Sequence, residues 1–292
     1  MKFTVRVPAT SANLGPGFDS FGLALQLYND VTIDTDAEPG VTWEGEGADE
    51  LPTDGSDMVS RAMRHEEKVC AQTAEPLPPF AMHGVNRIPL QRGLGSSSAA
   101  VVAGLLAAAT LLDVGRDSSP FSLLIEAAGL EGHPDNAAPA LFGGFTIANP
   151  GELVPPIRLD PHPDLRPIAL VPKTRVATAM ARAALKGEVS LGDAAFTGAH
   201  AAAVAVGITR DPDVLFTFRA LEDRLHQEAR LDLAPESRAA FEAIWSSNIP
   251  VCVSGAGPSL LAFERPPYEL PDLGPGWRVI HLEPDLTGAR IV

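Results

Sequence analysis

The chain has 292 residues, of which 45% are hydrophobic and 20% charged, values that fit an ordinary globular protein and exclude a disordered one. This length suits two packed lobes that share an interface, or one large domain. The formal net charge of −15 repels nucleic acid and anionic lipid, so neither is expected as a partner.

The cysteines and the apolar runs predict the cellular compartment of the protein. Cys70 and Cys252 lie far apart and in no metal-ligand spacing, which indicates a reducing compartment without disulfides. The N-terminus lacks an apolar signal core. The longest apolar run, from Ala99 to Leu112, is shorter than the ~20 residues that span a bilayer. We therefore expect a cytoplasmic protein with no membrane segment.

The first half of the chain mixes strands and helices without regular alternation. The predicted elements are strands over 2–7, 28–35, 80–85 and 143–148 and helices over 58–71, 96–112 and 119–130. Ser118 or Ser119 is expected to cap the last of these helices, with Pro120 in its first turn. Residues 36–56 are expected to form a loop or irregular edge strands.

Five prolines in residues 149–164 indicate a crossover between two lobes, predicted as residues 1–155 and 165–292. Beyond it, strands are expected over 167–171, 250–253, 259–263 and 277–282, the last strand of the chain. Helices are expected over 175–186, 192–209, 212–230 and 235–247. This order predicts the α+β class, with mixed sheets and packed helices.

The segment RGLGSSSAA (92–100) is the most informative part of the sequence. Gly93 and Gly95 let the backbone approach a ligand closely, and three serines then open a long apolar helix. The first N–H groups of a helix lack internal partners and carry positive dipole charge, so they bind anions. A capped, buried helix after a glycine turn is the alternative. The segment is neither a Walker A motif, because no Lys follows the second glycine, nor a dinucleotide fingerprint.

Extended to IPLQRGLGSSSAA (88–100), this segment resembles the signature of the GHMP kinases. Three more segments resemble the other motifs of that family, in the form found in its homoserine kinases, and the resemblance extends over nearly the whole chain. They are VPATSANLGPGFDSFGLAL (7–25), EGHPDNAAPALFGGF (131–145) and VSGAGPSLLAF (253–263). The resemblance implies a two-lobed kinase fold with the active site between the lobes. It also implies ATP-dependent phosphorylation of the L-homoserine hydroxyl in threonine biosynthesis, with Mg²⁺.

The resemblance also implies which residues bind ATP and metal. Ser97 and Glu126 would hold Mg²⁺, with Glu131 as the alternative carboxylate. Gly255 and Gly257, in a glycine-rich turn, would support the phosphate loop. The residues expected to wrap the ATP phosphates are Pro89, Gly93, Leu94, Gly95, Ser96, Ser97 and Ser98. Adenine contacts would come from residues 55–61, where this chain has Asp57 in place of the family's frequent Asn.

Homoserine carries an ammonium, a carboxylate and a hydroxyl, and a specific site must match all three groups. By resemblance, Asp19 binds the ammonium, with Asn13 beside the substrate. Arg182, in TAMARAAL (178–185), and Arg230, in LHQEAR (225–230), would clamp the carboxylate, which suits the planar guanidinium. Without the resemblance, Asp19 could equally be a turn residue, and each arginine is typical of a solvated helix surface.

The HPDN segment (133–136) would complete the site, with His133 and Asn136 facing homoserine. A structural turn or a weak metal site are the alternatives from the residues alone. Ser97, Glu126 and Asn136 are the residues expected to serve catalysis. Some GHMP kinases use an Asp at the position of Asp135 with a Lys partner. This chain is poor in Lys, so we expect no dedicated base.

Two other functions compete with this interpretation. One is a GHMP kinase for mevalonate or a sugar, whose substrate has no ammonium for Asp19. The other is a GHMP-fold regulator that binds nucleotide without catalysis. Such a protein would be expected to lose the loop serines or the metal carboxylate. The family suggests a homodimer, which the sequence does not test.

Overall fold

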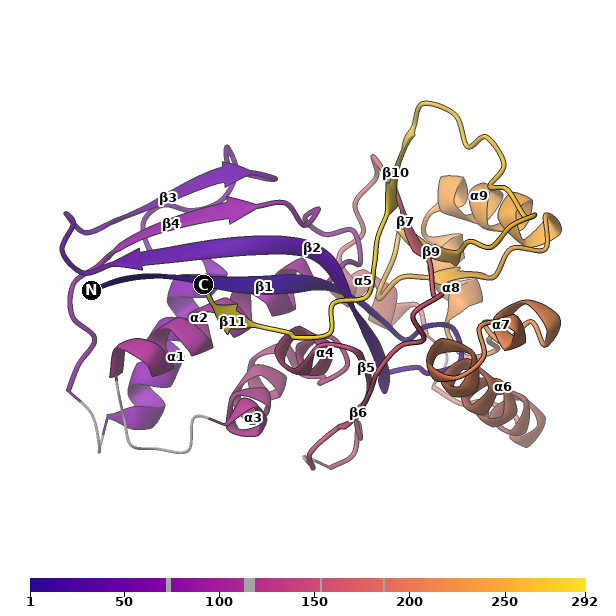
Figure 1. Ribbon diagram of the computed structural model, residues 1–292, viewed down its shortest axis with the longest axis horizontal. Coiled ribbons are helices and arrows are strands. Elements are labelled where there is room, and N and C mark those ends of the chain that lie inside the picture. The colour runs from indigo at the N-terminus through magenta and orange to yellow at the C-terminus, as the bar shows by residue number, and fades with distance from the viewer. Residues whose placement is uncertain (72–74, 113–118, 153, 186) are drawn as a thin grey trace.

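The computed structural model describes residues 1–71, 75–112, 119–152, 154–185 and 187–292, and it contains two sheets side by side (Figure 1). The first sheet has the order β11-β1-β2-β4-β3, and β5 joins it through β2 and also pairs with β6. All its pairings are antiparallel except β3 with β4. Apart from the C-terminal β11, its strands are β1 (Lys2–Ala12), β2 (Phe21–Asp34), β3 (Gly40–Gly45), β4 (Ala81–Asn86), β5 (Phe145–Ile147) and β6 (Ile157–Leu159).

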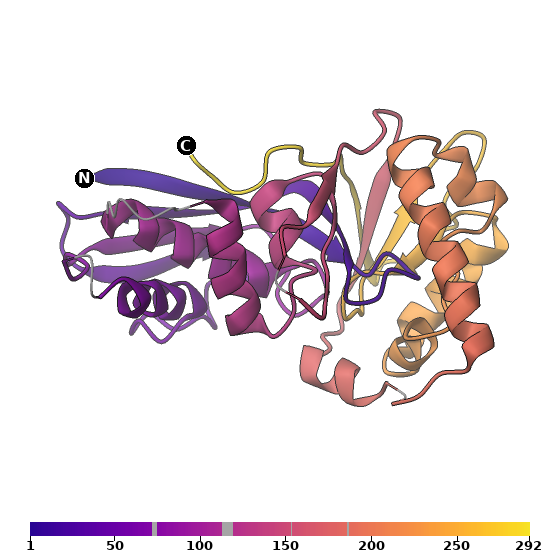
Figure 2. The same cartoon turned by 90° about the horizontal axis from the view of Figure 1, so that it is seen from below.

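Helices cover one face of this sheet (Figure 2). They are α1 (Met58–Cys70), α2 (Ser96–Leu112), α3 (Pro120–Glu131) and α4 (Ala137–Phe142). Helix α2 is apolar all round, and it contacts β1, β2, α1, α3 and α4, as expected for a helix in the middle of a core. The glycine-rich loop (residues 93–95) leads directly into the N-terminus of α2, so the loop is attached to a helix that is packed on several sides.

The second sheet lies in the other half of the molecule and has the antiparallel order β10-β7-β9-β8. Its strands are β7 (Pro167–Pro172), β8 (Val251–Val253), β9 (Leu260–Phe263) and β10 (Trp277–His281). Ala169 and Val171 of β7 belong to the core that extends into the first sheet, whereas Ile168 and Leu170 pack in a separate core. The central strand is thus buried on both faces. The helices here are α5 (Thr178–Ala183), α6 (Leu191–Thr209), α7 (Asp213–Thr217), α8 (Gln227–Asp232) and α9 (Pro235–Ser246).

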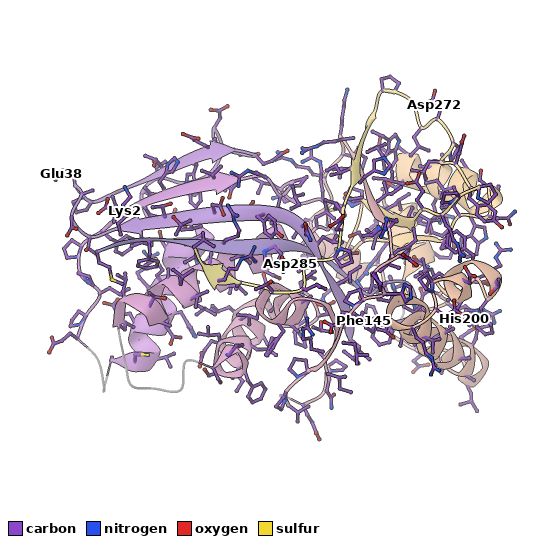
Figure 3. All side chains as sticks on the ribbon, in the orientation of Figure 1. Lys2, Glu38, Phe145, His200, Asp272 and Asp285 are labelled. Carbon is purple, nitrogen blue, oxygen red and sulfur yellow. The ribbon has the colours of Figure 1, made fainter. Side chains whose placement is uncertain are left out.

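The C-terminal segment returns to the first sheet, so both chain ends lie in the same half (Figure 1). Strand β11 (Arg290–Ile291) pairs with β1. Asp285, labelled in Figure 3, fixes this return. Its buried carboxylate accepts hydrogen bonds from the N–H groups of Thr287 and Gly288 and from the hydroxyl of Tyr28, at 2.6–3.0 Å. The last ten residues therefore pack on the first sheet rather than on the predicted second lobe. The rest of the predicted lobe division stays a prediction.

The predicted α+β class is confirmed, and most predicted elements are present. The largest error is the helix over 212–230, which is two short helices. The chain is interrupted because Arg219 adopts a left-handed conformation, with φ of 53°, and because Asp223 caps a new helix. Strand β2 starts seven residues earlier than predicted, and α4 and β11 were not predicted. Ser119 caps α3, whereas Ser118 and residue 186 lie outside the described residues.

Among the described residues, α6 is the one helix whose length and composition would let it cross a membrane. Asp193 and His200 interrupt its apolar run, so no membrane segment was expected there. Helix α6 packs Val204 and Ile208, which are fully buried, into the core that it shares with the first sheet, whereas 28% of its apolar window is buried.

The packing of α1 on α2 gives a test of the fold. A Cβ at Gly104 of α2 would overlap the carbonyl oxygen of Val59 in α1. Gly104→Ala is therefore expected to lower the free energy of unfolding by about 1–3 kcal/mol, although alanine favours helix by ~1 kcal/mol. Gly198→Ala, on the open side of α6 with no atom within 4 Å, is the matched control. It should raise the free energy of unfolding by about 0.5–1 kcal/mol. Urea unfolding measures both, and equal stabilisation would contradict the packing.

Candidate active site

A cavity of about 440 Å³ lies where the two halves meet. Its lining comes from the turn after β1, the start of α1, the loop before α2, the end of α3, and α5 and α8 of the other half. The segment 255–256, in the glycine-rich turn between β8 and β9, closes it. The cavity thus lies between the two halves, where the resemblance implied the active site would be. The cavity contains most of the residues singled out in the sequence.

The loop before α2 presents a helix N-terminus to the cavity. Gly95 adopts a φ of 71°, and a Cβ there would overlap the hydroxyl of Thr10, so only glycine lets the loop pass β1 this closely. Residues Ser96, Ser97 and Ser98 form the first turn of α2, whose N–H groups have no carbonyl partner within the helix. Leu94 and Pro89 are buried behind the loop and do not line the cavity.

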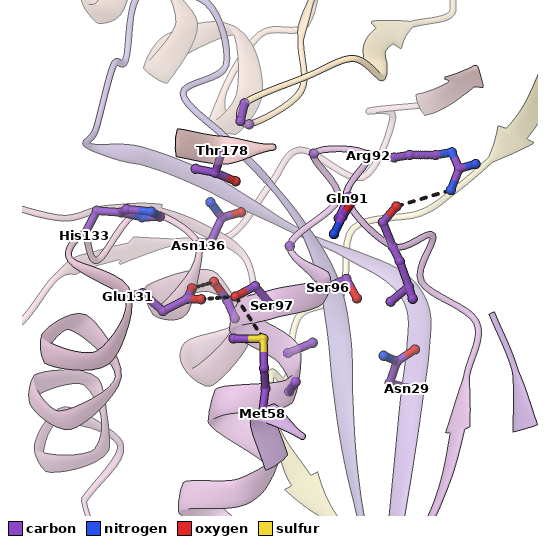
Figure 4. Close-up of a pocket in the computed structure, with 18 of the residues that line it drawn as sticks. Asn29, Met58, Gln91, Arg92, Ser96, Ser97, Glu131, His133, Asn136 and Thr178 are labelled. Atoms are coloured by element: carbon purple, nitrogen blue, oxygen red, sulfur yellow. Dashed lines mark hydrogen bonds between the residues drawn. The ribbon is translucent and has the colours of Figure 1, made fainter. Parts of the chain in front are cut away.

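Glu131, the last residue of α3, lies next to these serines (Figure 4). Its carboxylate accepts hydrogen bonds from the hydroxyls of Ser97 and Ser98. Ser97 is also 3.7 Å from the sulfur of Met58, at the start of α1. A carboxylate and two hydroxyls therefore converge at the mouth of the phosphate loop, and oxygen donors of this kind are those that Mg²⁺ prefers.

The structure places Glu131, and not Glu126, beside Ser97, so the metal role expected for Glu126 stays a prediction. Glu126 does not line the cavity, and its carboxylate lies 2.8 Å from Nε2 of His65 on α1. The reason is helical geometry. Five residues along a helix turn the side chain by about 140°, so Glu126 and Glu131 face different directions.

The HPDN segment presents a hydrogen-bonded cluster at the end of α3. Asp135 is buried and lies 2.7 Å from Nδ1 of His133. This hydrogen bond raises the pKa of His133 above its ordinary value. Asn136 accepts a 2.8 Å hydrogen bond from the hydroxyl of Thr10 and lies 3.4 Å from Asp135. No lysine is found among the described residues that line the cavity, so Asp135 has no lysine partner there.

Asp19 and Arg182 form an ion pair across the cavity. Two nitrogens of the Arg182 guanidinium lie 2.8 and 3.1 Å from the two carboxylate oxygens of Asp19. Asn13 positions Asp19 by accepting a 3.0 Å hydrogen bond from its N–H, and it donates one to the carbonyl of Gly255. The residues expected to bind the ammonium and the carboxylate of a zwitterion thus lie together, each paired with the other.

Arg230 is the deepest basic group of the cavity, with only 6% of its surface exposed. Its Nη1 donates to the carbonyl of Gly255 at 2.6 Å and to Nδ1 of His226 at 3.0 Å. Burial lowers the pKa of Arg230 to about 10, which leaves it charged at neutral pH. Nε is buried and has no hydrogen-bond partner among the described residues. A buried donor without a partner is costly, so a ligand oxygen at this end of the cavity would be bound favourably.

The glycine-rich turn joins the phosphate loop to the second half. The hydroxyl oxygen of Ser254 lies 2.7 Å from the carbonyl oxygen of Gly93. The N–H of Gly255 donates to the carbonyl of Ala12 at 3.1 Å. Gly257 does not line the cavity, and its N–H donates to the carbonyl of Ser254 within the turn.

The far end of the cavity contains residues that sequence reasoning missed. Asp57 points into its own helix cap, where it accepts hydrogen bonds from the N–H and hydroxyl of Ser60. Lining residues that the sequence analysis did not name as site residues include Asn29, Val31, Trp43, Met58 and Gln91, with Thr178 beside His133 and Asn136 (Figure 4). A lone tryptophan within the polar segment 36–56 was the available signal for Trp43. Met58, Gln91 and Thr178 lie inside segments that the resemblance covered, whereas nothing local in the sequence marked Asn29 or Val31.

His226 predicts how stability depends on pH. The ring is fully buried, and this burial lowers its pKa from 6.5 to about 4, although the nearby carboxylates of Asp223 and Asp19 oppose the shift. Between about pH 6.5 and 4 the unfolded chain binds a proton that the folded chain does not. The free energy of unfolding should therefore fall on acidification, by on the order of 2–3 kcal/mol.

Urea unfolding at pH 7, 5.5 and 4.5 measures this slope. The pKa of His133 is raised, so its contribution changes above pH 6.5; it affects the pH 7 measurement, and equally in both proteins. In His226→Asn, which does not titrate, the curve should be flatter over the same window. Parallel curves for both proteins would contradict the assignment.

Comparison with known proteins agrees with this geometry. Residues 57–144 match the GHMP kinases N terminal domain family. The homoserine kinase of Clavibacter michiganensis subsp. michiganensis is 43% identical over 266 residues, covering 90% of this chain and 83% of that protein. The homoserine kinase of Mycobacterium tuberculosis is 42% identical over 267 residues, covering 88% and 82%.

Solved structures show the same fold. The homoserine kinase of Cytophaga hutchinsonii superposes with a TM-score of 0.80 at 23% identity, covering 100% of this chain and 97% of that one. A mevalonate kinase superposes with a TM-score of 0.69 at 10% identity, covering 97% and 99%. These two relatives are more than 40% identical to the chain, and the match covers more than four fifths of the length of each. The chain therefore belongs to the homoserine kinase family of the GHMP kinases.

Proposed function

We propose that the protein transfers the γ-phosphoryl group of ATP to the hydroxyl of L-homoserine, giving O-phospho-L-homoserine and ADP, as a step of threonine biosynthesis. One observation carries the proposal. A helix N-terminus for phosphates shares a cavity with one acid and two arginines that match a zwitterion. The curated relatives named homoserine kinase support the same substrate.

In this proposal the phosphates of ATP bind at the start of α2. The N–H groups and hydroxyls of Ser96, Ser97 and Ser98 face anionic oxygens, and the helix dipole adds positive potential. Gly93 and Gly95 allow the close approach, and the turn containing Gly255 and Gly257 supports them from the second half. Trp43, at the far end of the cavity, supplies an apolar face for the adenine ring.

Ser97 and Glu131 would hold Mg²⁺, because their oxygens are the hard-ion donors that already lie together. No group of three or more His, Cys, Asp or Glu that could hold a metal occurs in the described part of the chain. Mg²⁺ in kinases is bound by one or two carboxylates with phosphate and water, and this site fits that pattern. When bound, the ion would neutralise charge on the phosphates.

The acceptor would bind opposite the phosphates, with its ammonium on Asp19 and its carboxylate on Arg182 and Arg230. Asn13, His133 and Asn136 complete its surroundings. The bond from the γ-phosphorus to the bridging oxygen of ADP breaks as the bond to the acceptor oxygen forms, and the hydroxyl proton passes to an oxygen of the transferred phosphoryl group. The contribution of the protein is chiefly positioning and charge stabilisation. Asp135 already accepts hydrogen bonds from His133, which supports a mechanism without a dedicated base.

The partners in this proposal are small molecules only. The charge of −15 argues against nucleic acid and anionic membranes. A homodimer, and a cytoplasmic location, stay predictions.

The substrate is tested by ADP release from the purified protein with MgATP. L-homoserine should support release at least tenfold faster than L-threonine, L-serine, mevalonate or galactose, because only a zwitterion of matching length pairs every charged group. Release with mevalonate or galactose alone would contradict the acceptor site. ATP binding without release in any reaction would favour the non-catalytic regulator.

The metal ligand is tested by a matched pair of variants on α3. Glu131→Gln should lower kcat by at least about tenfold and raise the Mg²⁺ concentration needed for half-maximal rate, because a metal carboxylate is lost. Glu126→Gln should leave that Mg²⁺ dependence unchanged, since Glu126 faces His65. Titration of Mg²⁺ at fixed ATP measures both. A larger effect of Glu126→Gln than of Glu131→Gln on the Mg²⁺ dependence would indicate that Glu126 is the metal ligand.

A further inference from the structure

His226 occupies a fixed, solvent-free position at the start of α8. The carboxylate of Asp223 accepts hydrogen bonds from the N–H groups of Leu225, His226 and Gln227 at 2.8–3.0 Å, which sets where the helix begins. The side chain of Gln227 then ties this start to β8 by accepting a 2.8 Å hydrogen bond from the N–H of Val253. Both the His226 and Asp223 side chains are completely buried.

The partners of the imidazole select one tautomer. Nε2 lies 2.8 Å from the carbonyl oxygen of Gly15, which can only accept, so Nε2 carries the hydrogen. Nδ1 lies 3.0 Å from Nη1 of Arg230, and a guanidinium can only donate, so Nδ1 must be the acceptor. A protonated ring would direct a second N–H at the guanidinium. The neutral ring is therefore the only form that satisfies both partners.

These bonds join the substrate arginine to the loop that carries Asp19. The Phe18 ring stacks on His226 with centroids 5.3 Å apart, and the guanidinium of Arg230 lies 5.5 Å from the same ring. Nη1 of Arg230 is thereby held by His226 and the carbonyl of Gly255, and the guanidinium lies over Phe18, while Nε has no hydrogen-bond partner among the described residues. The direction in which the guanidinium presents its remaining donors depends on His226.

We infer that His226 is a positioning residue for the acceptor. In its neutral tautomer it orients Arg230 toward the substrate carboxylate and fastens it to the Gly15–Phe18 loop beside Asp19. This inference rests on the proposed function, because it takes the ligand of Arg230 to be the carboxylate of homoserine. His226 does not line the cavity, so it acts through Arg230 and not by touching the substrate.

Two substitutions separate the two hydrogen bonds. In His226→Asn the amide oxygen stands near the position of Nδ1 and can accept from Arg230, but the side chain does not reach Gly15. In His226→Gln the amide reaches Gly15, but the acceptor for Arg230 is lost. His226→Gln should raise the KM for homoserine about 10- to 100-fold, because a buried charged donor loses its partner. His226→Asn should raise the KM for homoserine by no more than about threefold. The KM for ATP should stay within about twofold of the unsubstituted value in both variants.

A second acceptor distinguishes positioning from general damage. The compound 3-aminopropan-1-ol is homoserine without its carboxylate, so Arg230 has nothing to bind. Its kcat/KM should be the same for His226→Gln and the unsubstituted enzyme. An equal loss for both acceptors, or equal damage from Asn and Gln, would overturn the inference. His200→Gln is the matched control, because His200 is a buried histidine on α6 (Figure 3) whose one hydrogen-bond partner among the described residues is the carbonyl of Phe196.

Binding gives an independent readout if turnover of the amino alcohol is too slow to measure. Calorimetry compares homoserine affinity in His226→Gln, Arg230→Ala and the double variant, with thermal unfolding to verify that each is folded. The double variant should bind no more weakly than Arg230→Ala, because His226 acts only through that arginine. Additive losses would overturn the inference. Absence of ADP release by the unsubstituted enzyme with homoserine would instead refute the proposed function.

Discussion

The cavity depends on two glycine-rich turns, one from each half of the chain, that pack backbone against backbone. A Cβ on Gly93 would overlap the carbonyl oxygen of Ser254, so no other residue allows this approach. The N–H of Ser259 donates to the carbonyl of Arg92 at 3.3 Å, which adds a direct backbone link. Because α2 starts at one turn and Arg230 bonds to the other, this contact sets the separation between the phosphate end and the acceptor end. Catalysis by positioning requires that separation to be fixed.

An acidic protein that binds ATP and a carboxylate must create positive potential locally. Arg92 lines the cavity, but two of its nitrogens donate to the carbonyls of Pro172 and Lys173 at 2.9 Å, so its charge is used mainly for structure. The anion sites then rest on the N–H groups of α2 and on Arg182 and Arg230. Helix dipoles and buried guanidinium groups act over short distances. A chain of charge −15 can therefore attract anions inside the cavity although its surface repels them.

The sequence predicted those features whose cause is local. The Ser-rich start of α2, the Ser119 cap and the alternation of β1 each depend on a few neighbouring residues, and all are present. Features that depend on long-range packing could not be predicted. Strand β11 has two residues and forms only because β1 offers an open edge. The choice between Glu126 and Glu131 depends on which side of α3 faces α2, which the composition of the helix does not reveal.

The residues proposed to bind the substrate show the same division more finely. Motif resemblance singled them out, but it did not reveal their burial or their hydrogen-bond partners. Arg230 is buried and held by His226, whereas the Arg182 side chain is 39% exposed, lies on a six-residue helix and is held by Asp19. A zwitterion entering this site exchanges one ion pair for two, since its ammonium replaces the arginine and its carboxylate replaces the aspartate. An alcohol carrying only a carboxylate would draw Arg182 away and leave Asp19, with a side chain only 20% exposed, without a cation. The cost of that unpaired charge is a physical reason for a GHMP kinase with this pair to select an amino acid over mevalonate or a sugar.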